Sequence, residues 1–278
     1  MQILSYSKHL IIVLFLAGLV GCTTTSTKQG TVGIKREQLL LVSPAEMQKG
    51  AQLAYNSVLK EAKTAKKLNT NSAMLKRVRS IANRIIPQTA IFREDAPKWK
   101  WEVNVLESDQ LNAWCMPGGK IAFYTGIINK LKLTDAEIAA IMGHEIAHAL
   151  REHGRERASE QALTQVGLSA LSIFTGARGP TLDAAAMALQ VTVTLPNSRT
   201  HEVEADRMGV ELAARAGYNP YAAVSVWQKM EKQSDGGRPP EILSTHPSHA
   251  SRIKDLNAYA KKVEPLYRQA IRQKSYIR

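Results

Sequence analysis

The stretch that decides the fold is Thr134–Leu150, which reads TDAEIAAIMGHEIAHAL. A threonine followed three residues later by a glutamate forms a capping box, the usual start of a helix. Apolar residues then occupy nearly every side of that helix, which indicates a buried helix. His144, Glu145 and His148 are the polar exceptions. Because unpaired polar groups in a core cost several kcal/mol, their presence predicts a functional site inside the domain.

The spacing of these three residues is typical of zinc chemistry. His144 and His148 are four residues apart, so both imidazoles project from one face of the helix and can reach one zinc ion. Glu145 lies about 100° around the helix, where it could take a proton from an attacking water and pass it to a leaving amine. The pattern predicts a zinc-dependent endopeptidase. A His-Glu pair on a surface helix is the alternative, and the apolar surroundings disfavour it.

A third zinc ligand must come from elsewhere in the chain. A metzincin would have a histidine six residues after His148, where this chain has Gly154, so that class is excluded. Glu152 is a poor candidate, because three ligands on one straight helix do not close a tetrahedron easily. On a helix, Glu202 and Asp206 share a face, so Glu202 could bind zinc while Asp206 accepts a hydrogen bond from a ligand histidine. On spacing alone, a solvated acidic turn is equally favoured.

The separated motifs resemble those of a known family. HEIAH, followed some fifty residues later by SRTHEVEADRMG, resembles the zinc metallopeptidase family that includes the CAAX prenyl proteases, HtpX and bacterial periplasmic lipoprotein proteases. Further similar segments are NAWCMPGGK at 112–120, YTG at 124–126, THP at 245–247 and Arg252-Ile253. The resemblance covers about residues 45–260. It implies that Glu202 is the third ligand and that Glu204 is not, and it implies the periplasmic lipoprotein branch without a tetratricopeptide tail.

The predicted fold class is α+β and predominantly helical, a zincin-type domain over residues 43–278 with a small antiparallel sheet beside the HExxH helix. Alternating residues in Trp99–Val105 predict one strand, and Lys120–Thr125, after a Pro-Gly-Gly turn, predicts another. Helices are predicted over about 43–67, 72–86, 161–174, 182–195 and 201–216, from 220 onward, and in a basic tail from 251.

The second strand is also predicted to bind substrate. It comprises Lys120, Ile121, Ala122, Phe123 and Tyr124. An extended peptide could add to this strand through main-chain hydrogen bonds, which depend on extension more than on sequence. The expected substrates are therefore unfolded or misassembled polypeptides, as in quality control of envelope proteins.

The remaining histidines and Cys115 carry weaker signals. His246 lies between a threonine and a proline, in a predicted loop. It could stabilise an oxyanion, occupy the open position of the zinc ion in a latent state, or be a structural loop histidine. His153 and His249 are interpreted as surface residues, and Cys115 as a buried small hydrophobic residue.

The N-terminus has the features of a bacterial lipoprotein signal. Leu10–Val20 is an apolar run too short to span a membrane, as in a signal peptide over residues 1–21. Leu19–Cys22 resembles a lipobox, so Cys22 is predicted to carry lipid. Thr23, in place of aspartate, favours the outer membrane, facing the periplasm. Residues 22–42 are predicted to be a polar tether. An ordinary signal peptide with an incidental cysteine is the alternative.

Composition narrows the partners. The chain has 278 residues and a net charge of +13, with basic residues spread along it. Such a surface favours anionic headgroups or is simply soluble. No nucleic-acid-binding motif is present, so no nucleic acid partner is expected. A non-catalytic envelope lipoprotein, acting as a chaperone or scaffold with a structural or latent zinc site, is the rival function. Glu145 argues against it, because a structural site needs no base.

Overall fold

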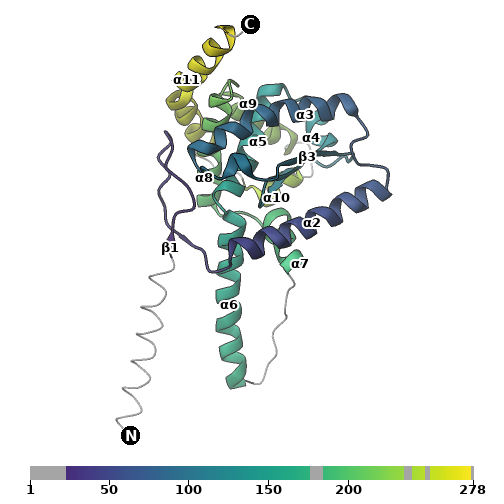
Figure 1. The fold of residues 1–278 in the computed structure, drawn as a ribbon, viewed down its shortest axis with the longest axis vertical. Helices are drawn as coiled ribbons and strands as arrows, with labels where there is room; N and C mark the ends of the chain where they lie inside the picture. The colour runs from purple at the N-terminus through teal and green to yellow at the C-terminus, as the bar shows by residue number, and fades with distance from the viewer. Residues whose placement is uncertain (1–22, 176–183, 235–239, 248–250, 277–278) are drawn as a thin grey trace.

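The computed structural model describes residues 23–175, 184–234, 240–247 and 251–276, and it is predominantly helical (Figure 1). The helices are α2 (Pro44–Thr64), α3 (Ser72–Ile85), α4 (Thr125–Lys130), α5 (Asp135–Leu150), α6 (His153–Thr175), α7 (Ala184–Leu189), α8 (Arg199–Arg215), α9 (Ala222–Ser234), α10 (Glu241–Thr245) and α11 (Arg252–Tyr276). The strands are β1 (Thr23–Thr24), β2 (Gln38–Leu39), β3 (Glu102–Leu106), β4 (Ala113–Met116) and β5 (Lys120–Tyr124). The predicted α+β class, dominated by helices, is confirmed.

Helix α5 forms the centre of the domain. Its predicted capping box is present: the Thr134 side chain accepts from the Glu137 backbone at 3.3 Å, and the Glu137 side chain accepts from the Thr134 backbone at 2.8 Å. Every residue of α5 from Glu137 onward is buried. Helices α3, α8 and α9 and strand β4 all pack against it, so the whole helix lies inside the core, as its composition predicts.

Helices α5 and α8 cross with their backbones in close contact. A Cβ atom added to Gly143 would lie 2.6 Å from the carbonyl oxygen of Gly209, and one added to Gly209 would lie 2.6 Å from the backbone nitrogen of His144. Only glycine at both positions permits this approach. The crossing brings the first half of α8 beside the two histidines of α5.

The sheet differs from the predicted antiparallel arrangement. Its strand order is β3-β5-β4, with β4 antiparallel to β5 across a tight turn and β3 parallel to β5. The sheet is therefore mixed. Strand β3 pairs with β5 and not with β4, the next strand along the chain. Local sequence patterns do not reveal a pairing between strands that are not consecutive.

Strand β5, predicted to bind substrate, is the central strand. Residues Lys120–Tyr124 pair with β3 along their whole length, and Lys120–Phe123 pair with β4. Its backbone groups are already engaged on both sides, so it cannot accept another strand, and that prediction is wrong. Strand β4, which packs on α5, is an edge of this sheet.

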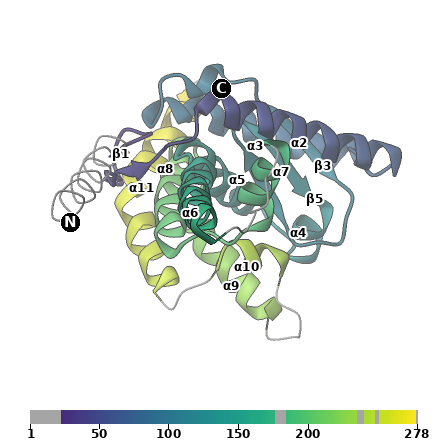
Figure 2. The ribbon, with the colours of Figure 1, turned by 90° about the horizontal axis from the view of Figure 1, so that it is seen from below.

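A break after α5 redirects the chain. Helix α5 ends at Leu150, and Glu152 adopts a positive φ of 54° before α6 begins. Helix α6 then projects from the body in Figure 1 and is seen nearly end-on in Figure 2. The segment predicted as one helix over 182–195 is α7 followed by a π-helical turn, Gln190–Thr194, that ends before Pro196.

Residues 24–42 do not form the loose tether that their polarity suggests. Val32 and Ile34 belong to the main hydrophobic core. The Glu211 carboxylate accepts hydrogen bonds from the backbone of Thr31 and Val32 at 3.1 and 3.0 Å. The prediction is therefore corrected for this segment, because its few apolar residues have partners that only the folded domain supplies. The predicted signal peptide and Cys22 lie outside the described residues.

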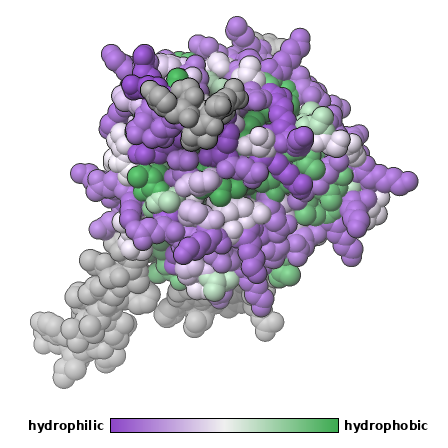
Figure 3. Space-filling model, turned by 45° about the horizontal axis from the view of Figure 1, so that its top comes forward, coloured by the Kyte–Doolittle hydropathy of each residue, from purple (hydrophilic) through white to green (hydrophobic). Residues whose placement is uncertain are grey.

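The surface is mostly hydrophilic on the face shown in Figure 3, with hydrophobic residues visible between polar ones. Within the described ranges, the exposed large hydrophobic residues are Leu41, Leu53 and Ile271. In the same part of the chain, no helix combines the length and the apolar character that crossing a bilayer requires.

Candidate metal centre

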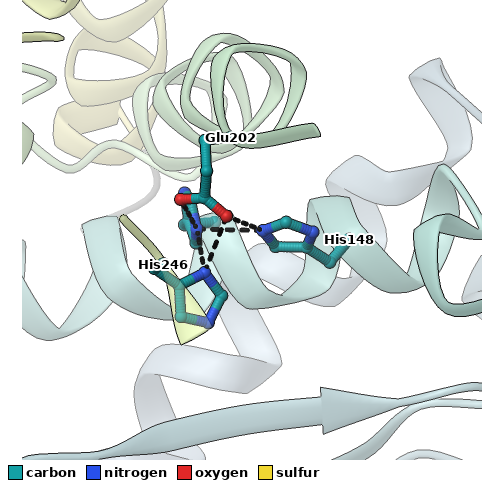
Figure 4. A group of neighbouring side chains, drawn as sticks. His148, Glu202 and His246 are labelled. Carbon is teal, nitrogen blue, oxygen red and sulfur yellow. Dashed lines mark hydrogen bonds and ion pairs between the residues drawn. The ribbon is translucent and has the colours of Figure 1, made fainter. Parts of the chain in front are cut away.

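Four donor side chains from three elements converge in the core. His144 and His148 come from α5, Glu202 from the first turn of α8, and His246 from the residue after α10. Figure 4 shows the Glu202 carboxylate and the rings of His148 and His246 pointing toward a common centre. All four are at most 9% exposed, so the site is built into the core, as predicted for His144, His148 and Glu202.

The spacing of the donors fits a tetrahedral metal. The two Nε2 atoms of His144 and His148 are 3.0 Å apart, and the carboxylate of Glu202 lies 3.5 and 3.3 Å from them. Nδ1 of His246 is 3.1 Å from Nε2 of His144 and 3.0 Å from Glu202. Donors about 2.0–2.1 Å from a tetrahedral zinc ion lie roughly 3.3–3.4 Å apart. The side chains therefore match the edges of such a site closely.

The protonation of His144 is set by Asp206. Nδ1 of His144 lies 2.9 Å from Oδ1 of Asp206, which also accepts from Arg252 at 2.7 Å. Burial raises the pKa of Asp206, but Arg252 and His144 outweigh it and lower that pKa overall. Because the ionised carboxylate can only accept, Nδ1 of His144 carries the proton, and Nε2 presents a lone pair to the centre. Asp206 thus lies where the sequence predicts.

The protonation of His148 is set by His153, which the sequence analysis places at the surface. His153 is fully buried, and its Nδ1 lies 2.8 Å from Nδ1 of His148, while its Nε2 lies 3.0 Å from Glu204. Burial, with His201 alongside, keeps the pKa of His153 well below its usual value, so the ring is neutral. Its Nε2 donates to Glu204, so its Nδ1 accepts from His148. Nε2 of His148 is then left with a lone pair directed at the centre.

The assignment of His153 to the surface is therefore wrong. The residue lies five positions after His148, which on a continuous helix would direct it elsewhere. The break at Glu152 turns the chain and brings the ring back against α5. The turn is recognised in the structure by the positive φ of Glu152, a non-glycine residue, and no pattern in the amino-acid sequence predicts it. His249, also assigned to the surface, lies outside the described residues.

Glu204 belongs to a buried ion-pair network behind the site. It accepts from Arg151 and Arg36 as well as from His153. A second group of metal-binding residue types, His153, Glu156 and His201, lies in this network. The Glu156 carboxylate is already engaged by Arg36 at 2.6 and 2.9 Å. We therefore interpret this second group as part of an ion-pair network. Glu204 is not among the donors of the metal centre, as the resemblance implies.

Glu145 is placed for proton transfer. It is 3% exposed, and its Oε1 is buried without a hydrogen-bond partner. The same oxygen is 3.5 Å from Nε2 of His246. Burial raises the pKa of Glu145 above its ordinary value. A carboxylate with a free oxygen beside converging metal donors has the geometry expected of a general base.

His246 is held in place by its own loop and by Asn197. The backbone nitrogen of Asn197 donates to the Thr245 carbonyl at 2.8 Å, and its side-chain amide lies 3.4 Å from Nδ1 of His246. Burial lowers the pKa of His246, but the carboxylates of Glu202 and Glu145 outweigh it and raise that pKa overall. Of the roles considered for His246, the geometry favours the one in which it acts as a fourth metal donor.

Two cavities meet at Glu145 and His246. The larger, which is partly open to solvent, is also lined by His148 and Cys115. The smaller is mainly apolar, with Trp227 among its lining residues. Cys115 is 3% exposed, and burial raises the pKa of its thiol well above the usual range, as expected of an inert residue.

Comparisons with known proteins agree with this geometry. The family model described as "Peptidase family M48" matches residues 73–260. Mitochondrial metalloendopeptidase OMA1 of Bos taurus is 33% identical over 237 residues, which is 80% of this chain and 44% of that protein. OMA1 of Arabidopsis thaliana is 39% identical over 156 residues, 56% of this chain and 31% of that protein.

A bacterial relative is also similar. The "Beta-barrel assembly-enhancing protease" of Escherichia coli is 30% identical over 179 residues, 60% of this chain and 36% of that protein. The chain thus spans about half or less of the length of these curated relatives. The matched region contains every donor of the metal centre together with Glu145 and Asp206. The chain belongs to peptidase family M48.

Proposed function

We propose that this chain is a zinc-dependent endopeptidase. The observation that carries the proposal is the Glu145 carboxylate, buried with a free oxygen beside two imidazole lone pairs and Glu202. Family membership supports a metal-dependent peptidase, and the nitrogen-rich donor set with one carboxylate suits zinc. Because the chain covers only part of its relatives, its activity is a proposal for this chain itself.

The side chains divide the work of hydrolysis among them. Bound zinc would supply Lewis acidity toward the scissile carbonyl and toward water. His144, His148 and Glu202 would hold the ion, with Asp206 and His153 fixing the two imidazole tautomers. Glu145 would accept the proton of the attacking water and deliver it to the leaving amine. Its raised pKa suits both roles, since the protonated form must also be able to give up its proton.

His246 distinguishes a resting site from an open one. A catalytic zinc site keeps one position free of protein ligands, whereas a structural site uses four. Here Nδ1 of His246 lies at the fourth corner of the donor set. We propose that His246 occupies this position at rest and leaves it when substrate binds. The same four donors are also what the rival function, a non-catalytic scaffold with structural zinc, would need.

Strand β4 is the better candidate for substrate pairing. It is an edge of its sheet and packs against α5, and Cys115 on β4 lines the cavity that contains Glu145. An extended polypeptide added along this edge would run past the metal centre. Such pairing favours unfolded or misassembled polypeptides, because folded proteins rarely expose an extended segment as long as strand β4.

The proposed location is the periplasmic face of the bacterial outer membrane, with a lipid on Cys22. The lipobox-like sequence supports it. The printed name of the Escherichia coli relative connects that protein with β-barrel assembly, which supports misassembled envelope proteins as substrates here. The OMA1 relatives are mitochondrial proteins, so the shared domain is used in more than one compartment.

The decisive experiment compares zinc-loaded wild type with Glu145→Gln on an unfolded protein such as casein. We expect equal zinc content and a loss of cleavage of about 10²–10⁴-fold in the variant, the range for removal of a general base. Equal zinc content with no cleavage by either protein would instead favour the non-catalytic scaffold.

A further inference from the structure

One arginine in the wall of the larger cavity has no ion-pair partner among the described residues. Arg157 lies in the second turn of α6 and lines the larger cavity together with Glu145 and His246. It is only 9% exposed. Its Nη1 donates to the side-chain oxygen of Asn197, and its Nε is buried without a hydrogen-bond partner. Among the residues that the structure describes, no carboxylate lies within ion-pair distance of this guanidinium.

The neighbouring arginines behave differently. Arg155, which lines the same cavity, pairs with Glu152 at 2.6 Å, and Arg151 pairs with Glu204 at 3.2 Å. Burial lowers the pKa of Arg157 to about 10, although the carboxylates of Glu202, Glu160, Glu156 and Glu145, which lie beyond ion-pair distance, act in the opposite direction. Removing a charge from water without a partner is strongly unfavourable. Because the other buried arginines, Arg151 and Arg252, form ion pairs within the protein, an arginine without one suggests that its partner is a ligand.

The position of Arg157 identifies which part of a substrate it would meet. Asn197 is fixed by hydrogen bonds from its backbone and side chain to the Thr245 carbonyl, at 2.8 and 3.1 Å. The same side-chain amide is 3.4 Å from Nδ1 of His246. The guanidinium of Arg157 is thus one amide group away from the metal donors. A group that it binds would belong to the residue next to the scissile bond.

The chemistry of the cavity selects the ligand. Much of the wall is apolar, formed by Met47, Trp99 and Ala149 among others. Glu152, the other carboxylate in the wall besides Glu145, is already paired with Arg93 at 2.6 Å and with Arg155. A planar guanidinium with an unused Nε matches the two oxygens of a carboxylate. An incoming carboxylate would therefore meet, in Arg157, a guanidinium without an ion-pair partner in a largely apolar wall.

We propose that Arg157 binds a carboxylate of the substrate polypeptide beside the scissile bond, and so makes acidic peptides the preferred substrate class. The carboxylate comes from an Asp or Glu side chain or from the free C-terminus of the substrate. The inference rests on the proposed peptidase function. It adds a specificity-determining residue, Arg157, to a site whose metal and base do not discriminate between side chains.

The test uses labelled, unstructured peptides of one sequence. One peptide has a central Glu and an amidated C-terminus, one has Gln with an amidated C-terminus, and one has Gln with a free C-terminus. Dissociation constants are measured by fluorescence anisotropy against the zinc-loaded full chain carrying Glu145→Gln, which prevents cleavage. The same measurements are repeated with Arg157→Gln added, and with Arg155→Gln added as the control that removes a paired charge from the same cavity.

We expect at least one carboxylate peptide to bind about tenfold more tightly than the neutral peptide, a factor that corresponds to one charge-assisted contact. Arg157→Gln should abolish this preference and Arg155→Gln should keep it. Preference for the Glu peptide assigns the side-chain carboxylate, and preference for the free acid assigns the C-terminus. Equal binding of all three peptides, or a preference that survives Arg157→Gln, overturns the proposal.

Two further measurements separate this inference from other causes. Arg157→Gln should leave the melting temperature unchanged or raise it, because it removes an unpaired buried charge and keeps a donor for Asn197; a large fall would indicate a structural role and count against the proposal. Cleavage of the same peptides is then followed with Glu145 intact. If the protein binds carboxylate peptides preferentially but cleaves none of them, the proposed peptidase function is wrong and this inference stands. If it cleaves peptides without any preference for a carboxylate, this inference is wrong and the peptidase function stands.

Discussion

The tautomers of two buried histidines determine whether the centre can hold a cation. Asp206 fixes His144 directly, whereas Glu204 fixes His148 through the neutral ring of His153. Both chains of hydrogen bonds end on charged groups, which makes them stronger than neutral contacts. Without them, either imidazole could turn a proton toward the other, and two N–H groups 3.0 Å apart would repel.

At this scale we expect His153→Ala to weaken zinc binding by about 10–100-fold, because His148 loses the acceptor that holds its tautomer. His153→Gln should recover part of the affinity, since its amide oxygen can accept the same hydrogen bond. Zinc dissociation constants from competition with a chelator check both values. An alanine variant that binds zinc as tightly as wild type would show that His153 only fills space.

A second prediction at the residue scale concerns His246. If its ring occupies the fourth position at rest, His246→Ala should raise kcat/KM on an unfolded substrate severalfold and leave the catalytic step to Glu145. If it stabilises the oxyanion, the same change should lower kcat by about 10²–10³-fold. Steady-state kinetics at saturating zinc decide between the two, with Glu145→Gln as the inactive reference. We expect the increase.

At the scale of elements, the site depends on how closely α5 and α8 cross. Gly209→Ala would place a Cβ atom 2.6 Å from the His144 backbone nitrogen, so the helices must separate. We expect a loss of about 1–3 kcal/mol in unfolding free energy, the usual cost of overpacking, together with weaker zinc binding as Glu202 shifts. Chemical denaturation and zinc titration measure the two effects.

Gly154→Ala is the matched control for this change. It is also a helical glycine, and its added Cβ would come no closer than 3.4 Å to Thr192. It should be neutral or slightly stabilising, because alanine is the better helix former. Equal losses in both variants would show that helix crossing is not the cause.

Elements also differ in how well the sequence predicts them. The capping box at Thr134 is a local pattern, and it is present. The pairing of β3 with β5 and the central place of β5 depend on distant partners, and these were not predicted. The three donors on α5 and α8 were predicted because two share a helix face and the third lies in a recognisable motif. His153 and Arg157 were missed because their roles depend on the break after α5.

At the scale of the whole molecule, the N-terminal segment closes the network behind the metal centre. Arg36 donates to Glu204 at 3.0 Å and to Glu156 at 2.6 Å. Burial raises the pKa of Glu156, but hydrogen bonds from Arg36, His201 and Gln38 lower it overall to well below its usual value. The segment thus contributes stability that depends on ionised carboxylates.

We expect Arg36→Gln to lower the unfolding free energy by about 2–3 kcal/mol at pH 7, because two buried carboxylates lose their shared cation. The depressed pKa of Glu156 stabilises the fold fully above its unfolded value near 4.5 and loses that effect as pH falls further. The gap between wild type and variant should therefore narrow below about pH 4.5. Denaturant titrations at pH 7 and pH 3.5 test this, and a constant gap would contradict it.

If Cys22 carries a lipid, the packed N-terminal segment would limit how far the catalytic domain can move from the membrane. Cys22, the proposed lipid attachment point, is bonded directly to Thr23, the first residue of β1, and β1 pairs with β2 on the domain. A single residue spans at most about 3.5 Å, so a lipidated chain would have almost no slack between bilayer and domain. The active site of such a molecule would stay at a nearly constant distance from the membrane. A polypeptide would then be cleaved only where it lies close to the lipid surface.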